Sequence, residues 1–307
     1  MKNAAIDVLA ARDIRSQVDK VLRGLGNPEP PINLLEVREL LKLDVQYYSG
    51  VNDGPLREMI SKVKVGAKQL LMRPSLILDV VRKAQLRALW LPDRRRILID
   101  ETIPELKKRH AEAHEIVHCI TPHHESFLLG DDRETLSPSF HEELEGEANY
   151  GASQLLFMRG GFTELARDLP QRFDSVEKLS KVFGNTLTMT LWRFVEDTPP
   201  DQATFGMITC HPWYLPEDVD EAGPCRHFIE SAGFRGQFGN VTEAGAFQAM
   251  KSYATRARGG PLGEAEVVFK SRTGESHRFR MESFSNRYEV LTLGIHLGPV
   301  LTSILTI

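Results

Sequence analysis

The chain has 307 residues, enough for one large domain or two smaller ones with a sizeable core, and its composition of 41% hydrophobic and 26% charged residues is typical of soluble globular proteins. The formal net charge of −4 shows no overall basic excess of the kind that binds nucleic acid, although a local basic patch is compatible with it. The three cysteines are few and odd in number, which argues against a disulfide framework.

Neither end of the chain has the pattern of a targeting or membrane segment. Residues 1–22 carry a charge every few positions and lack the continuous apolar stretch of a signal peptide. The longest apolar run, residues 293–307, is too short and too interrupted to span a bilayer. We therefore expect a soluble, cytoplasmic protein with no membrane partner.

The N-terminal part predicts short helices and strands. Residues 4–24 place apolar side chains near helical spacing, which predicts an amphipathic helix that ends at GNPEPP, residues 26–31. A second helix is expected over 34–41, a strand over 44–48 and a third helix over 56–72.

A β-hairpin is predicted next, from RALWLP at 87–92 and RRILID at 95–100, because a Pro-Asp-Arg turn separates these two strand-like runs. Thr102-Ile-Pro-Glu105 then has the form of a capping box, with proline near the first helical position. The helix that begins there is expected to stop before Pro122.

Further helices are expected over 139–159, ended by Gly160-Gly161, and over 175–196, with a break at Gly184-Asn185. The proline-rich run DTPPDQ at 197–202 is the predicted domain boundary.

The remaining residues are richer in glycine and proline and contain three strand-like runs, at 264–271, 277–283 and 288–295. We therefore predict an α+β protein with two domains. Residues 1–198 would form a helix-rich domain with a small β-sheet, and residues 199–307 a small α+β or mostly β accessory or recognition domain.

The predicted helix after the hairpin contains the pattern His114-Glu115-x-x-His118. Positions i and i+4 share one face of a helix, so the two imidazoles can face one metal ion. Glu115 is rotated off that face, where a carboxylate can act as general base toward water. The pattern predicts a zinc site with Glu115 as the catalytic residue. A charged surface helix that contains this pattern by chance is the alternative.

A third ligand is expected from another element, and Glu147 is the predicted one. It lies in an apolar stripe between Leu144 and Gly151, where a carboxylate is costly unless it is paired or bound to a metal. Small neighbouring residues would let this helix approach another helix closely. A salt bridge from Glu147 to Arg109 is the alternative interpretation, and His141 is the competing ligand.

RHAEAHEIVH at 109–118, followed by EANYGASQLLFM at 147–158, resembles the ImmA/IrrE-type metallopeptidases. That family shows an R-F-T-x-A-H-E-x-x-H helix and a later helix of the form E-x-x-A-N-x-F-A-A-x-L-L-M-P. The resemblance extends over roughly residues 5–196, in the order of the predicted elements. It departs from the family at His110-Ala111, where Phe-Thr is usual, and at Arg159, where proline is usual.

The resemblance implies a zincin-like fold and a zinc endopeptidase of the HExxH gluzincin type. His114, His118 and Glu147 would hold Zn²⁺, and Glu115 would be the general base and then the general acid. Members of this family typically cleave or otherwise inactivate a helix-turn-helix repressor in mobile-element induction or stress responses. A regulatory protein of that kind is therefore the expected substrate and partner.

The residue that stabilises the oxyanion is not assigned by the sequence. The candidates are Arg109, Tyr150, His123, His124 and His141. Tyr150 could equally be a core aromatic residue. Asn149 could orient a histidine, although it falls on the other side of its helix from Glu147.

A second, structural zinc site could form from Cys210-His211 and Cys225-x-His227, although a Cys-x-x-Cys pair is absent there. Buried thiols are the simpler interpretation, and Cys119 is also expected in the core.

Two other functions stay open. A DNA-binding transcription regulator could keep this fold without peptidase activity, with residues 175–196 as its helix-turn-helix, but this segment has few basic residues. A toxin–antitoxin-like binding protein could use the metal structurally, although a structural site would not require Glu115.

Overall fold

The computed structural model describes residues 6–48, 88–91, 95–124, 138–215 and 223–300. Helices dominate the N-terminal part and a five-stranded antiparallel sheet the C-terminal part, which confirms the predicted α+β class. Contacts between residues divide the chain into an N-terminal unit, Asn3–Gly161 with Phe183–Asn185, and a C-terminal unit, Phe162–Val182 with Thr186–Ile307. The predicted boundary at 198/199 falls inside the C-terminal unit and stays a prediction.

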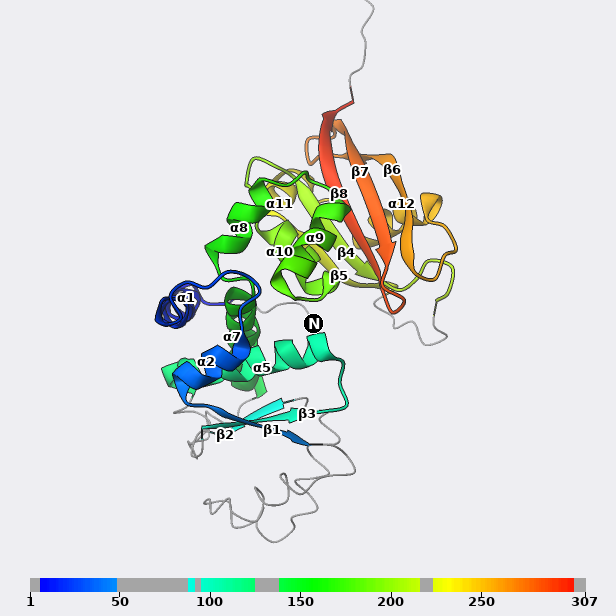
Figure 1. Cartoon of the computed structure of the whole chain (residues 1–307). Coiled ribbons are helices and arrows are strands. Elements are labelled where there is room, and N and C mark those ends of the chain that lie inside the picture. The colour runs from blue at the N-terminus through cyan, green and yellow to red at the C-terminus, as the bar shows by residue number, and fades with distance from the viewer. Residues whose placement is uncertain (1–5, 49–87, 92–94, 125–137, 216–222, 301–307) are drawn as a thin grey trace, which may run out of the picture. The chain divides into compact units, whose positions relative to one another are not determined.

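The N-terminal unit combines helices with a three-stranded sheet. Its elements are α1 (Val8–Gly24), α2 (Leu34–Leu41), β1 (Asp44–Tyr48), β2 (Ala88–Leu91), β3 (Arg96–Asp100), α5 (Glu105–Ile120) and α7 (Pro138–Leu156). The sheet order is β1-β3-β2, with β1 parallel and β2 antiparallel to β3, so the predicted hairpin is confirmed. Figure 1 shows α5 and α7 together beside this sheet. The predicted helix over 56–72 and the turn at 92–94 lie outside the described residues.

The start of α5 differs from the predicted capping box. Pro104 is the N-cap residue, and no side chain caps this end. Thr102 instead donates its backbone N–H and its hydroxyl to Asp100 Oδ1, at 2.8 and 2.7 Å. Asp100, at the end of β3, therefore binds the threonine that a capping box would use to cap the helix.

The helices α5 and α7 pack closely because α7 presents small residues to α5. Ala148 and Ala152 are fully buried. A Cβ atom on Gly151 would lie 2.5 Å from Val117 Cγ1 and 2.9 Å from Ile14 Cγ2, so only glycine fits there without a shift. This contact fixes which residues of α7 face α5, in agreement with the predicted close approach.

The end of α7 also differs from the sequence prediction. The helix stops at Leu156, and Gly160 and Gly161 begin the next helix instead of ending this one. Met158 and Arg159 adopt left-handed backbone conformations, with φ of 51° and 54°. Arg159 Nε lies 2.7 Å from Asp19 Oδ1, and this ion pair connects the residues after α7 to α1.

The C-terminal unit contains a five-stranded sheet with helices. Its elements are α8 (Gly160–Arg167), α9 (Phe173–Phe183), α10 (Leu187–Glu196), β4 (Thr204–Thr209), β5 (Cys225–Glu230), α11 (Ala232–Phe238), α12 (Glu243–Tyr253), β6 (Gly260–Lys270), β7 (Ser276–Ser285) and β8 (Val290–Pro299). The three predicted strand-like runs correspond to β6, β7 and β8. The predicted break between two helices is the turn at Gly184, whose φ is +63°.

Helices cover both faces of this sheet, whose order is β5-β4-β8-β7-β6. On β4, Phe205 and Met207 join a buried aromatic core with Phe234 of α11 and residues of α12. Gly206 between them faces the opposite side of the sheet, where an added Cβ would lie 3.5 Å from Leu191 Cγ of α10. None of the described helices combines the length and the apolar composition needed to cross a membrane.

The close contact of α5 with α7 makes a stability prediction. Gly151→Ala should lower the free energy of unfolding by about 1–3 kcal/mol, because the added methyl group overpacks the contact with Val117 and Ile14. Gly146→Ala, on the same helix with nothing within 4 Å of the added Cβ, is the matched control. It should stabilise the protein by about 0.5–1 kcal/mol through helix propensity. Denaturant unfolding measures both, and equal stability of the two variants would contradict this packing.

Candidate metal centre

The helix α5 places the two histidines of the predicted motif side by side. The Nε2 atoms of His114 and His118 lie 3.2 Å apart, as expected for imidazoles one helical turn apart. Glu115 is buried, with 7% of its surface exposed. Burial, and then the charges of Asp100 and Glu115, raise the pKa of Tyr48 to about 12, so a protonated phenol at the end of β1 lies in the field of Glu115.

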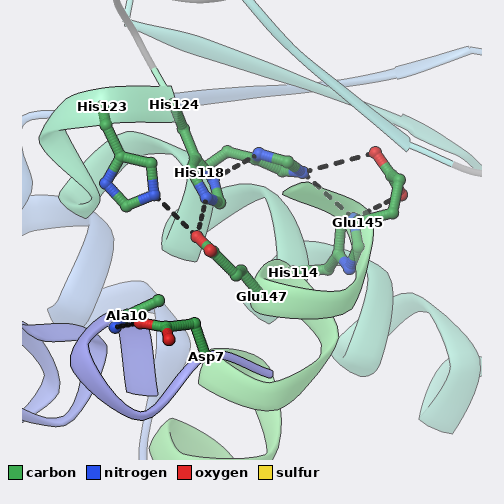
Figure 2. A network of polar contacts seen from close by, with 8 residues as sticks. All are labelled: Asp7, Ala10, His114, His118, His123, His124, Glu145 and Glu147. Atoms are coloured by element: carbon green, nitrogen blue, oxygen red, sulfur yellow. Dashed lines mark hydrogen bonds and ion pairs between the residues drawn. The ribbon is translucent and has the colours of Figure 1, made fainter. Parts of the chain in front are cut away.

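The carboxylate that faces both histidines belongs to Glu145 of α7. Its Oε2 lies 3.2 Å from His114 Nε2, and its Oε1 lies 3.6 Å from His118 Nε2. One ligand atom from each of these three residues falls within 4.8 Å of the others (Figure 2). Two imidazoles and a carboxylate form a donor set that a zinc ion takes in proteins. The Glu145 side chain is 43% exposed, so an ion there would have a side open to solvent.

The charges of this cluster are coupled. Burial lowers the pKa of His114, but its hydrogen bond with Glu145 and the charges of Glu115 and Glu145 outweigh burial and raise the pKa overall. Burial raises the pKa of Glu145, but its interactions with the two histidines, the hydrogen bond with His114 first, together outweigh burial and hold the pKa well below its ordinary value. The contact with Glu145 thus favours the protonated form of His114, and a metal ion that binds this histidine would displace that proton.

The structure places Glu147, the sequence-predicted third ligand, in a neighbouring cluster. Its Oε2 lies 2.6 Å from His123 Nε2 and 2.9 Å from His124 Nε2, and these three residues form a second potential metal-binding group. The sequence argument that a carboxylate in the apolar stripe needs a partner therefore describes Glu147 correctly. Its partners are the two histidines that follow Pro122, and its role as a ligand beside His114 and His118 stays a prediction.

The family pattern on α7 points to Glu145, although the search for carboxylates within the apolar stripe of this helix does not find it. In the family pattern E-x-x-A-N, counting back from Ala148 and Asn149 leads to Glu145. Glu145 and Asn149 are also one helical turn apart, so they share the face of α7 that meets α5. Asn149 Oδ1 accepts a hydrogen bond from His114 Nδ1 at 3.1 Å, which is the histidine-orienting contact considered for it from sequence.

The predicted oxyanion candidates have other partners in the structure. Arg109 donates from Nη2 to the carbonyl oxygen of Ile32 at 2.8 Å, and burial lowers its pKa. Tyr150 accepts a hydrogen bond from Arg15 at 3.1 Å. His123 and His124 bind Glu147, and the side chain of His141 lies outside the described residues. The oxyanion-stabilising group stays unassigned.

The cysteine–histidine pairs of the C-terminal unit do not gather as a metal site among the described residues. Cys225 donates from Sγ to the carbonyl oxygen of His227 at 3.4 Å, and His211 donates from Nε2 to the carbonyl oxygen of Ala257 at 2.9 Å. All three cysteines are free thiols, and Cys119 is only partly buried. For Cys225 the structure agrees with the simpler interpretation, a buried thiol.

Comparisons with known proteins add the fold but no chemistry. No known protein family profile matches the sequence, and no curated protein does. Among solved structures, the chain is similar to a Mycobacterium tuberculosis transcriptional regulator, with a TM-score of 0.54 and 12% identity, over 94% of this chain and 76% of that chain. At this identity the similarity shows a shared fold alone. The class that fold and site define is therefore an α+β protein with a potential His-His-Glu metal centre.

The environment of Cys225 predicts slow alkylation. Burial, followed by the charge of Glu243, raises the pKa of this thiol from 9.0 to about 12. At pH 8 its thiolate fraction should be on the order of a thousandfold smaller than in the unfolded chain, and only the thiolate reacts. Mass spectrometry after timed iodoacetamide treatment, with and without denaturant, measures this protection. Labelling of Cys225 at the same rate in folded and unfolded protein would contradict it.

Proposed function

We propose that this protein is a zinc-dependent endopeptidase of the ImmA/IrrE type. The observation that carries the proposal is the convergence of Glu145 from α7 on the two histidines of the His-Glu-x-x-His helix. Glu115, the residue that the motif assigns to proton transfer, is buried on the same helix. The combination of a metal donor set with this buried carboxylate supports hydrolysis rather than simple metal storage.

In this proposal His114, His118 and Glu145 hold the ion, and Asn149 keeps the His114 ring oriented through its Nδ1–H. When bound, Zn²⁺ supplies Lewis-acid polarisation and lowers the pKa of a water molecule. Glu115 takes the proton from the attacking water and delivers it to the nitrogen of the departing amine. The partial exposure of Glu145 keeps one side of the proposed site open to solvent.

A regulatory protein is the proposed substrate, and a helix-turn-helix repressor is the specific expectation from the family resemblance. The similarity in fold to a transcriptional regulator supports a role in gene control but names no substrate. We further propose that the C-terminal unit, which does not contain the His-Glu-x-x-His motif, makes accessory contacts to the substrate.

A DNA-binding regulator without peptidase activity is the second candidate function, favoured by the name of the similar structure. The helices α9 and α10 correspond to the predicted helix-turn-helix segment. However, α10 packs against the sheet through Leu191 and Val195, and Arg193 Nε is held 3.0 Å from Asp197 Oδ2. A recognition helix needs an exposed face with free basic groups, so this segment supports DNA binding poorly.

The experiment that tests the proposal compares zinc content and cleavage of a repressor encoded beside this gene in four variants. Glu115→Gln should keep zinc and lose cleavage by about 100-fold or more, because it removes the proton carrier and no ligand. Glu145→Gln should lose most of its zinc and its activity. Glu143→Gln, an exposed residue of the same helix, is the matched control and should behave as wild type.

Glu147→Gln separates the two assignments of the third ligand. Because Glu145 and not Glu147 faces His114 and His118, Glu147→Gln should keep zinc better than Glu145→Gln does. Loss of zinc in Glu147→Gln with retention in Glu145→Gln would restore the ligand set predicted from sequence. Full cleavage by Glu115→Gln would contradict the peptidase proposal, and tight wild-type binding to DNA at physiological salt would favour the regulator.

A further inference from the structure

Two carboxylate–histidine clusters in the N-terminal unit touch at one point. The Nδ1 atoms of His118 and His124 lie 2.9 Å apart, which is a hydrogen-bond distance between two ring nitrogens (Figure 2). His118 belongs to the proposed metal centre and His124 to the cluster around Glu147. The contact therefore joins a proposed ligand to a carboxylate that does not reach the ion.

With both imidazoles neutral, only one arrangement of protons satisfies the contacts between Glu147, His124 and His118. A neutral imidazole has one donor and one acceptor nitrogen. Glu147 can only accept while it is ionised, so His124 donates from Nε2 at 2.9 Å and must accept at Nδ1. His118 then donates from Nδ1, and its Nε2 keeps a lone pair. That lone pair faces His114 Nε2 and the carboxylate of Glu145.

We propose that Glu147 is a positioning residue that acts through His124 to hold His118 in the tautomer required for metal binding. The inference rests on the proposed metal centre of His114, His118 and Glu145 and deepens it. Glu147 accepts from His124, His124 accepts from His118, and the Nε2 atom of His118 is presented to the ion. Carboxylate partners of ligating histidines fix tautomer and ring orientation in this way, and here one further imidazole is inserted between carboxylate and ligand.

Burial stabilises this relay. His124 is completely buried and the Glu147 side chain is only 15% exposed, so solvent competes little for these hydrogen bonds. Breaking one of them would leave a buried polar group without a partner, which is costly. His123 donates a second hydrogen bond to Glu147 at 2.6 Å, from a side chain that is 40% exposed and lies outside the line from Glu147 to His118.

The same geometry argues against two ions bound at once. Metal binding by His124 through Nε2 would move its proton to Nδ1, where it faces His118 Nδ1 at 2.9 Å. His118 would then have to accept there and carry its own proton on Nε2, which removes its ligand lone pair. The group of His123, His124 and Glu147 thus serves the first site instead of forming a second one beside it.

The tautomer is tested in the metal-free protein, which makes the result independent of zinc binding and cleavage. Two-bond nitrogen–proton NMR correlations of the histidine rings distinguish Nδ1–H from Nε2–H. His118 should be the Nδ1–H form in wild type and in Glu147→Gln, because an amide oxygen still accepts from His124. It should lose that form in Glu147→Leu. An Nε2–H form of His118 in wild type would overturn the positioning role of Glu147, and this result does not depend on whether the protein is a peptidase.

Metal affinity supplies the second readout, with Zn²⁺ itself as the probe. Glu147→Leu should bind zinc about 10–100-fold more weakly, as is typical for loss of such a partner, and Glu147→Gln should recover much of that loss. His123→Ala is the matched control, because it removes a contact of Glu147 but leaves the line to His118 intact, and its affinity should equal that of wild type. Binding of two zinc ions, the second lost in His123→Ala, would overturn the relay in favour of a second metal site.

Discussion

The close approach of α5 and α7 is the constraint on which the candidate site depends. Gly151 lies against Val117 and Ile14 with no room for a side chain. That contact sets the rotation of α7, and the rotation places Glu145 and Asn149 opposite His114. Because Gly151 has no side chain, α7 lies close enough to α5 for Glu145 and Asn149 to reach His114.

Around this contact the polar groups form one continuous network. Asn149 accepts a hydrogen bond from His114, His124 accepts one from His118, and Glu147 accepts hydrogen bonds from His123 and His124. His118 and His124 are buried, so the contacts between them and to Glu147 are costly to break and hold these two rings in place. The metal-free protein is then preorganised, with the Glu145 carboxylate pairing with the two histidines that would share it with an ion.

Local patterns predicted most elements because each rests on a local physical preference. Helical spacing located α1, α2 and α5, and strand-like runs located β2, β3 and the three C-terminal strands. Periodicity also showed that Glu147 is core-facing, but it could not name the partner, because His123 and His124 follow a chain turn whose direction no pattern gives. The end of α7 was misplaced since Met158 and Arg159 adopt left-handed conformations that glycine usually supplies. The strand β4 was not predicted, because it is buried along its whole length and lacks the alternation of polar and apolar residues that marks a half-exposed strand.

The central claim is that one metal ion binds between α5 and α7. A crystal structure of the zinc-loaded protein, with anomalous data on both sides of the zinc absorption edge, tests this claim most directly. The account predicts a single anomalous peak about 2.0–2.2 Å from nitrogen atoms of His114 and His118 and from a carboxylate oxygen of Glu145. A peak among His123, His124 and Glu147, or no peak near α5, would contradict it.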